Sequence, residues 1–127
     1  MKRVLMIDDD LPILEATIEL LREEGLDAYG ESVPERAIAR ARALGPHVVF
    51  VDLMMPGMDG VELARKLRAD PGLRHVPIVL MTAHPDAPFF AHAAGATRFL
   101  RKPFSAGALI EAAREAAVPA PEADAHA

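Results

Sequence analysis

The stretch Val48-Val-Phe-Val-Asp52 decides the fold, because four apolar residues in succession end abruptly in a carboxylate. Such runs without polar alternation are typical of strands buried on both faces, as in a parallel sheet covered by helices. Two further apolar runs end in the same way: 4–7 is followed by Asp8 and Asp9, and 78–81 by Thr82. A fourth expected strand, 97–100, is followed by Arg101 and Lys102. Ligands of parallel sheets lie at the carboxyl ends of strands, so we expect these polar side chains to form one site.

The composition indicates one domain and excludes several classes of function. The chain has 127 residues, of which 51% are hydrophobic and 26% charged, and this size can bury one substantial core. Its net charge of −5 and lack of a long basic run argue against direct nucleic-acid binding. It has no cysteine, which excludes disulfides, thiolate catalysis and cysteine-ligated metals. No apolar run approaches the ~18 residues that cross a bilayer, so we expect no membrane contact and a cytoplasmic location.

Strands and helices are predicted to alternate along the chain. A first helix should follow Asp10 as its N-cap and end at Gly25, and Asp27–Glu31 is a weak strand that we place at a sheet edge. A capping box at 32–35 should open a second helix, which ends at Gly45. Further helices are expected at 60–69, at 87–94 and after Ser105. Residues 119–127 lack periodicity and are predicted to be a disordered tail or a linker stub after a domain at 1–118.

Alternating strands and helices with short connections predict a doubly wound α/β sheet. A dinucleotide site would need a glycine-rich turn after the first strand, and a nucleoside triphosphate site would need a P-loop. This chain has three aspartates there, at 8–10, which repel phosphate unless a cation intervenes.

Four motifs in order carry a resemblance to the response regulator receiver domain, the CheY-like module of two-component signalling. The motifs are Ile7-Asp-Asp-Asp10, Val51-Asp-Leu-Met-Met-Pro-Gly-Met-Asp-Gly60, Met81-Thr-Ala83 and Phe99-Leu-Arg-Lys-Pro-Phe104. The resemblance covers residues 1 to about 118. It implies a single-domain, flavodoxin-like, five-stranded parallel sheet of strand order 2-1-3-4-5 with helices on both faces.

Three carboxylates at adjacent strand ends require a positive neighbour. Asp8, Asp9 and Asp52 would repel one another by roughly 4 kcal/mol per pair at 4 Å and an effective dielectric near 20. Oxygen-only donors suit Mg²⁺ or Mn²⁺, with Asp9 and Asp52 as direct ligands, the backbone carbonyl of Met54 as a third, and Asp8 acting through water. The alternative is that Asp8 and Asp10 only cap the first helix, and we accept it for Asp10.

Asp52 is the predicted phosphoryl acceptor, attacking phosphorus to form an aspartyl phosphate. Its alternative role is that of a turn residue at the strand end. Thr82 should donate its hydroxyl to a phosphoryl oxygen, although threonine is also an ordinary strand residue. Lys102 should pair with Asp52 at rest and with the phosphoryl group afterwards, although surface lysines are usually just solvated. The resemblance implies a cis bond between Lys102 and Pro103 that aims the lysine inward.

Phe99 occupies the position of the family's switch aromatic. Movement of Thr82 toward phosphate would vacate space into which this ring rotates, and the alternative is a simple core aromatic. One of Phe89 and Phe90 should be core and the other partly exposed. The basic cluster that includes Arg101 is expected to be a solvated rim.

The favoured function is a stand-alone receiver that takes phosphate from a histidine kinase or phosphotransfer protein and switches a surface for an unknown protein target. It would catalyse only its own phosphorylation and dephosphorylation, so it is not classed as an enzyme. A first alternative is a metal-dependent phosphohydrolase with an aspartyl nucleophile, which usually has a second acid where Met54 stands. A second is a receiver-like scaffold that takes no phosphate. Dimerisation is left open.

Overall fold

Five parallel strands form one sheet in the order β2-β1-β3-β4-β5, which confirms the predicted topology. The computed structural model describes residues 2–116, so the predicted tail at 119–127 and the domain end at 118 lie outside the described residues. The strands are β1 (Arg3–Ile7), β2 (Asp27–Glu31), β3 (Val48–Asp52), β4 (Ile78–Thr82) and β5 (Arg98–Arg101). The helices are α1 (Leu11–Glu23), η1 (Pro34–Arg36, a 3-10 turn), α2 (Ala37–Leu44), α3 (Gly60–Ala69), α4 (Ala87–Ala94) and α5 (Ala106–Ala116).

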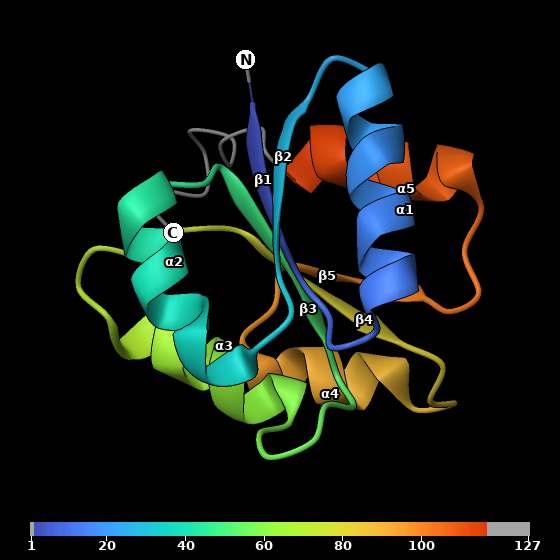
Figure 1. The fold of residues 1–127 in the computed structure, drawn as a ribbon. Coiled ribbons are helices and arrows are strands. Elements are labelled where there is room, and N and C mark those ends of the chain that lie inside the picture. Colours follow the sequence, from blue (N-terminus) through green and yellow to red (C-terminus); the bar gives the residue numbers. More distant parts are fainter. Residues whose placement is uncertain (1, 117–127) are drawn as a thin grey trace, which may run out of the picture.

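The helices cover both faces of the sheet (Figure 1). Helices α1 and α5 lie on one face, and α2, α3 and α4 lie on the other. Side chains of the central strands alternate between two cores: Met6 and Phe50 point toward α1 and α5, whereas Ile7 and Val51 point toward the other three helices. Full burial of each such side chain contributes about 1.5–3 kcal/mol, which explains why these strands carry no polar alternation.

Three helices begin with a side-chain cap, at residues where the sequence places a helix start. Asp10 accepts a hydrogen bond from the amide of Ile13, Asp59 from that of Glu62, and Ser105 from that of Ala108. No helix within residues 2–116 is long and apolar enough to cross a bilayer.

The predicted capping box at Ser32 is wrong. Val33, not Ser32, precedes the 3-10 turn η1, and no side chain caps it. The carboxylate of Glu31 accepts the Val33 amide at 3.0 Å, so the side-chain acceptor at this turn is Glu31 rather than Ser32. Helix α2 therefore begins later, at Ala37.

The strand register brings the predicted polar residues to one level. Ile7 pairs with Val51, so Asp8 emerges beside Asp52. Asp52 itself pairs with Met81, which places Thr82 one residue further on the neighbouring strand. In turn Thr82 pairs with Arg101, so that Lys102 leaves β5 at the same edge of the sheet.

Candidate functional site

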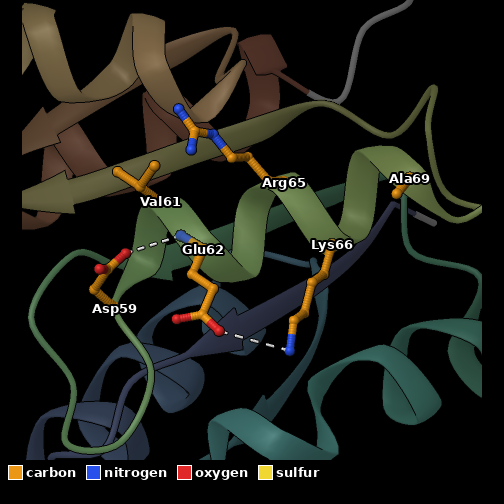
Figure 2. Close-up of a pocket in the computed structure, with 6 residues that line it drawn as sticks. All are labelled: Asp59, Val61, Glu62, Arg65, Lys66 and Ala69. Atoms are coloured by element: carbon orange, nitrogen blue, oxygen red, sulfur yellow. Dashed lines mark hydrogen bonds and ion pairs between the residues drawn. The ribbon is translucent and has the colours of Figure 1, made fainter.

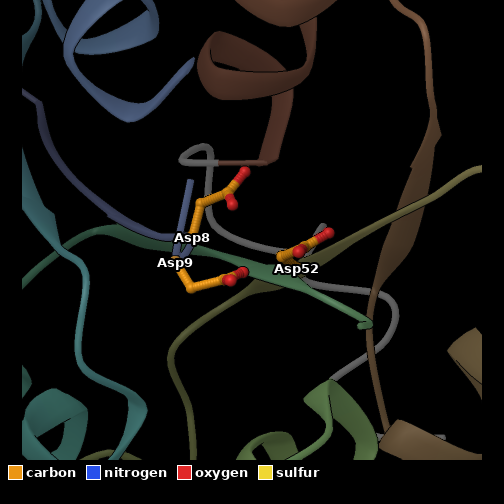
Figure 3. Close-up of side chains that lie close together, drawn as sticks. All are labelled: Asp8, Asp9 and Asp52. Carbon is orange, nitrogen blue, oxygen red and sulfur yellow. The ribbon is translucent and has the colours of Figure 1, made fainter. Parts of the chain in front are cut away.

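Three carboxylates meet at the carboxyl edge of the sheet (Figure 3). Asp8 and Asp9 follow β1, and Asp52 ends β3. Each offers an oxygen within 4.8 Å of the others. Asp8 and Asp52 are buried, whereas Asp9 is exposed. The predicted acidic cluster is therefore formed, with one side open to solvent.

Lys102 is the ammonium that reaches this cluster. Its Nζ lies 2.9 Å from Oδ1 of Asp52 and 3.3 Å from Oδ2 of Asp8. The Lys102–Pro103 peptide bond is cis, as the resemblance implied. The backbone amide of Lys102 donates to the carbonyl of Thr82, which ties the lysine to the end of β4.

Burial and charge set the protonation of this pair. Burial raises the pKa of Asp52; Lys102 opposes this by its hydrogen bond and charge, and the charges of Asp8 and Asp9 add to the rise. Burial lowers the pKa of Lys102, but its hydrogen bond to Asp52 and the charges of Asp52 and Asp8 outweigh it, so the net pKa is raised. One ammonium thus faces three carboxylates, and the cluster keeps an excess of negative charge.

The donor chemistry fits a hard divalent cation. The three clustered side chains, Asp8, Asp9 and Asp52, all offer carboxylate oxygens. Hard cations such as Mg²⁺ prefer oxygen ligands over sulfur or imidazole. The excess negative charge left by Lys102 is a second reason for a cation. Asp9, Asp52 and the carbonyl of Met54 would hold it, with Asp8 through water. The Met54 side chain itself points into solvent, 74% exposed.

Asp8 and Asp10 divide the capping work between them. Asp10 caps α1, and Asp8 accepts the Asp10 amide through Oδ1 at 3.0 Å while its Oδ2 faces Lys102. Asp8 therefore serves the turn and the cluster together, which reconciles the two interpretations drawn from the sequence.

Thr82 is buried at the end of β4, with its side chain held by the following loop. Its Oγ1 accepts the amide of His84 at 2.9 Å, and Ala83 between them is exposed. The hydroxyl proton of Thr82 is thus free to be donated elsewhere.

Phe99 lies outward on β5 and is 37% exposed. Arg101 covers it, with the guanidinium carbon 5.7 Å from the ring centroid. The same guanidinium donates from Nη1 to the carbonyl of His84 at 2.8 Å. Arg101, predicted to be a solvated rim residue, therefore joins Phe99 to the loop after Thr82. No local sequence signal marks this role, because it depends on the pairing of β4 with β5.

Gly60 is a second site residue that sequence reasoning missed. Its amide donates to the carbonyl of Leu53 at 2.8 Å, and a Cβ at this position would meet the carbonyl of Asp52 and the Cα of Leu53. The start of α3 can approach the end of β3 this closely only without a side chain. The pair Asp59-Gly60 at the expected helix start was the available signal.

Comparisons with known proteins agree with this geometry. A family model described as the response regulator receiver domain matches residues 4–114. The DNA-binding response regulator MtrA of Mycobacterium tuberculosis is 37% identical over 115 residues, which cover 89% of this chain and 49% of that protein. The C4-dicarboxylate transport transcriptional regulatory protein DctD of Rhizobium meliloti is 38% identical, covering 89% of this chain and 25% of that protein. The chain thus spans about half the length of MtrA and about a quarter of the length of DctD.

Solved structures show the same fold. The chemotaxis protein CheY4 of Vibrio cholerae superposes with a TM-score of 0.85 at 27% identity, covering 91% of this chain and 98% of that one. A response regulator from Chloroflexus aurantiacus gives a TM-score of 0.84 at 27% identity, covering 91% and 97%.

Proposed function

The chain belongs to the response regulator receiver family of two-component systems, and from this premise we propose that Asp52 accepts a phosphoryl group from a phosphohistidine on a histidine kinase or phosphotransfer protein. One observation carries the proposal. Asp52 is buried at a strand end, with the Lys102 ammonium 2.9 Å away and two further carboxylates beside it.

The transfer makes one bond and breaks one. A carboxylate oxygen of Asp52 attacks phosphorus, the P–N bond to the partner's imidazole breaks, and its electron pair returns to the ring nitrogen. Lys102 pairs with a phosphoryl oxygen, and Thr82 donates its hydroxyl proton to another. A bound Mg²⁺ or Mn²⁺ supplies charge compensation for the transferring oxygens. Water later cleaves the acyl phosphate, and the chain turns over no other substrate.

The switch follows from the position of Thr82. Movement of this side chain toward the phosphoryl group vacates space between β4 and β5. The Phe99 ring, outward in this structure, rotates into that space and changes the surface formed by α4, β5 and α5. Support comes from the register of β4 and β5, in which Phe99 pairs with Leu80 and Arg101 with Thr82, so that Phe99 lies two residues from the position opposite Thr82.

The setting of this switch in the cell is also a proposal. We retain the sequence predictions of a cytoplasmic location and of output through a protein partner. The net charge of −5 supports a protein rather than a nucleic acid as the direct target of this domain. MtrA, a DNA-binding relative, is about twice as long as the matched region.

Intact-mass measurement tests the proposal. The protein is incubated with Mg²⁺ and a small acyl phosphate, and we expect a gain of one phosphoryl group that is lost in Asp52→Ala and without the cation. Asp86→Asn is the matched control, because Asp86 is an exposed acid that caps no amide. An unchanged gain in Asp52→Ala contradicts the assignment of the acceptor. Rapid multiple turnover of organic phosphates would instead indicate a hydrolase.

A further inference from the structure

A groove between α3 and α4 is used by no step of the proposed phosphoryl transfer. Its volume is about 360 Å³, which accommodates one or two large side chains. It opens beside the loop that follows Asp52. Its principal lining residues are Leu53, Met54, Arg65, His84, Phe89 and Phe90.

The walls of the groove expose large apolar side chains. Met54 is 74% exposed and Phe89 is 61% exposed. Phe89 packs edge-on against Phe90, with centroids 5.2 Å apart, and Phe90 packs in the same way against His84 at 4.7 Å. Phe90 also packs against the core, so the aromatic wall formed by His84, Phe89 and Phe90 is anchored to the folded protein. Exposed apolar side chains on a supported wall are typical of protein-binding surfaces.

The groove also presents a cation without an acidic partner. Arg65 donates from Nε to the carbonyl of Ala93 on α4, which fixes the guanidinium over the groove. Within residues 2–116 no carboxylate forms an ion pair with it. Figure 2 shows Val61 and Arg65 on one side of α3, and Glu62 and Lys66 on the other. On that other side Lys66 is paired with Glu62 at 3.7 Å. The carboxylate of Asp59 also lines the groove, but it accepts the amide of Glu62 as the cap of α3 and forms no ion pair with Arg65 among the described residues.

We propose that this groove docks a protein partner through a large aromatic side chain next to a carboxylate. The aromatic side chain contacts Met54 and Phe89, and the carboxylate pairs with Arg65, whose planar guanidinium suits two-point binding of a carboxylate. The apolar side chains of the groove suit the aromatic group, and the Arg65 guanidinium beside them has the opposite charge to the carboxylate.

The groove is connected to the acceptor, so this inference rests on the proposed function where it concerns regulation. Leu53 and Met54 directly follow Asp52 in the chain. The His84 amide donates to Thr82, so a shift of Thr82 toward phosphate moves the aromatic wall. The partner is therefore one that reads the phosphorylation state of this domain.

A peptide pair tests the docking chemistry directly. The probes are acetyl-Ala-Trp-Glu-Ala-amide and its Gln counterpart, and because the chain has no tryptophan, indole fluorescence reports the peptide alone. We expect the Glu peptide to bind the unphosphorylated protein about tenfold more tightly than the Gln peptide, as one charge-assisted contact allows. Amide shifts in ¹⁵N spectra should be confined to residues of the groove.

Two variants and a matched control separate the contributions. Arg65→Gln should remove the preference for the Glu peptide, and Phe89→Ala should weaken both peptides. Lys66→Gln, on the other side of α3, should leave both affinities unchanged. The proposal is wrong if the two peptides bind with equal affinity, or if the amide shifts lie outside the groove. It is also wrong if Arg65→Gln and Lys66→Gln lose equal affinity for the Glu peptide. Self-association through the groove, measured by sedimentation and abolished by Phe89→Ala, would also overturn it.

Phosphorylation provides the last arm. Loading Asp52 with an acyl phosphate and Mg²⁺ should change the affinity for the Glu peptide at least about threefold. If intact mass shows that the protein is phosphorylated and its affinity for the Glu peptide is unchanged, the proposal that the partner distinguishes the two states of Asp52 is wrong. If Asp52 takes no phosphate at all, the proposed function fails, while the titrations of the unphosphorylated protein still decide the docking chemistry.

Discussion

At the scale of single residues, the positions of Asp8 and Asp52 depend on individual side-chain atoms of the residues around them. Asp8 divides its two carboxylate oxygens between the Asp10 amide and Lys102. Gly60 has no side chain, and this allows α3 to start against the backbone of Asp52. Asp52 is therefore positioned by backbone contact as well as by charge.

Gly60→Ala should destabilise the protein and impair phosphorylation together. The added methyl would overlap the Asp52 carbonyl, and relief of that overlap costs about 1–3 kcal/mol. Urea unfolding should show a lower midpoint. Gly107→Ala, in the first turn of α5, is the control, because its Cβ would meet only the Ser105 side chain at 3.9 Å and should not lower the midpoint. Wild-type stability and phosphorylation in Gly60→Ala would contradict this account.

At the scale of elements, local sequence rules predicted most helices, failed at one helix start, and could not predict contacts that depend on distant parts of the chain. The bounds of α3 and α4 were predicted correctly, because Asp59-Gly60 and the prolines at 85 and 88 act within a few residues. The capping box at Ser32 failed: η1 starts after Val33 with no side-chain cap, and the side-chain acceptor at this turn is Glu31 at the end of β2. The role of Arg101 could not be predicted, because it requires the β4–β5 register and the path of the loop at His84.

Arg101→Gln should loosen the loop between β4 and α4. The lost hydrogen bond to the His84 carbonyl stabilises the loop by about 1 kcal/mol, so hydrogen exchange of the loop amides at 84 and 86 should accelerate about fivefold. Arg98→Gln is the matched control: its guanidinium pairs with Glu115 on α5 and does not contact this loop. Equal acceleration in both variants would show that Arg101 acts only through general stability.

At the scale of the whole molecule, the sheet divides the protein into two cores, and ion pairs at the surface connect the helices that cover it. The convergence of Asp8, Asp52, Thr82 and Lys102 followed from the sequence, because buried strands end where polar residues begin. The strand order came from the family resemblance, and the structure confirms it. Contacts between helices did not follow from the sequence, because no pattern within one helix specifies its neighbour. Arg42 of α2 with Asp70 after α3 is such a contact.

Acid should weaken the protein through Asp70. The hydrogen bond from Arg42 comes first among the causes that lower the pKa of this carboxyl, and the Gly72 amide and the Arg42 charge add to it. A carboxyl whose folded pKa is lowered stabilises the fold above its unfolded pKa of about 3.9. That contribution is lost as the pH falls through the lower, folded value.

Urea unfolding of wild type and Asp70→Asn at pH 6 and pH 3 checks this sign. Wild type should be the more stable at pH 6. The difference in midpoint should narrow at pH 3, because below the unfolded pKa of about 3.9 the unfolded wild-type chain binds a proton that the paired carboxyl of the folded protein resists. Asp86→Asn, which removes an exposed acid that caps no amide, should show no comparable narrowing. A difference that widens on acidification would mean that the pairing with Arg42 does not lower the pKa of Asp70, and that the link between α2 and α3 is one of shape alone.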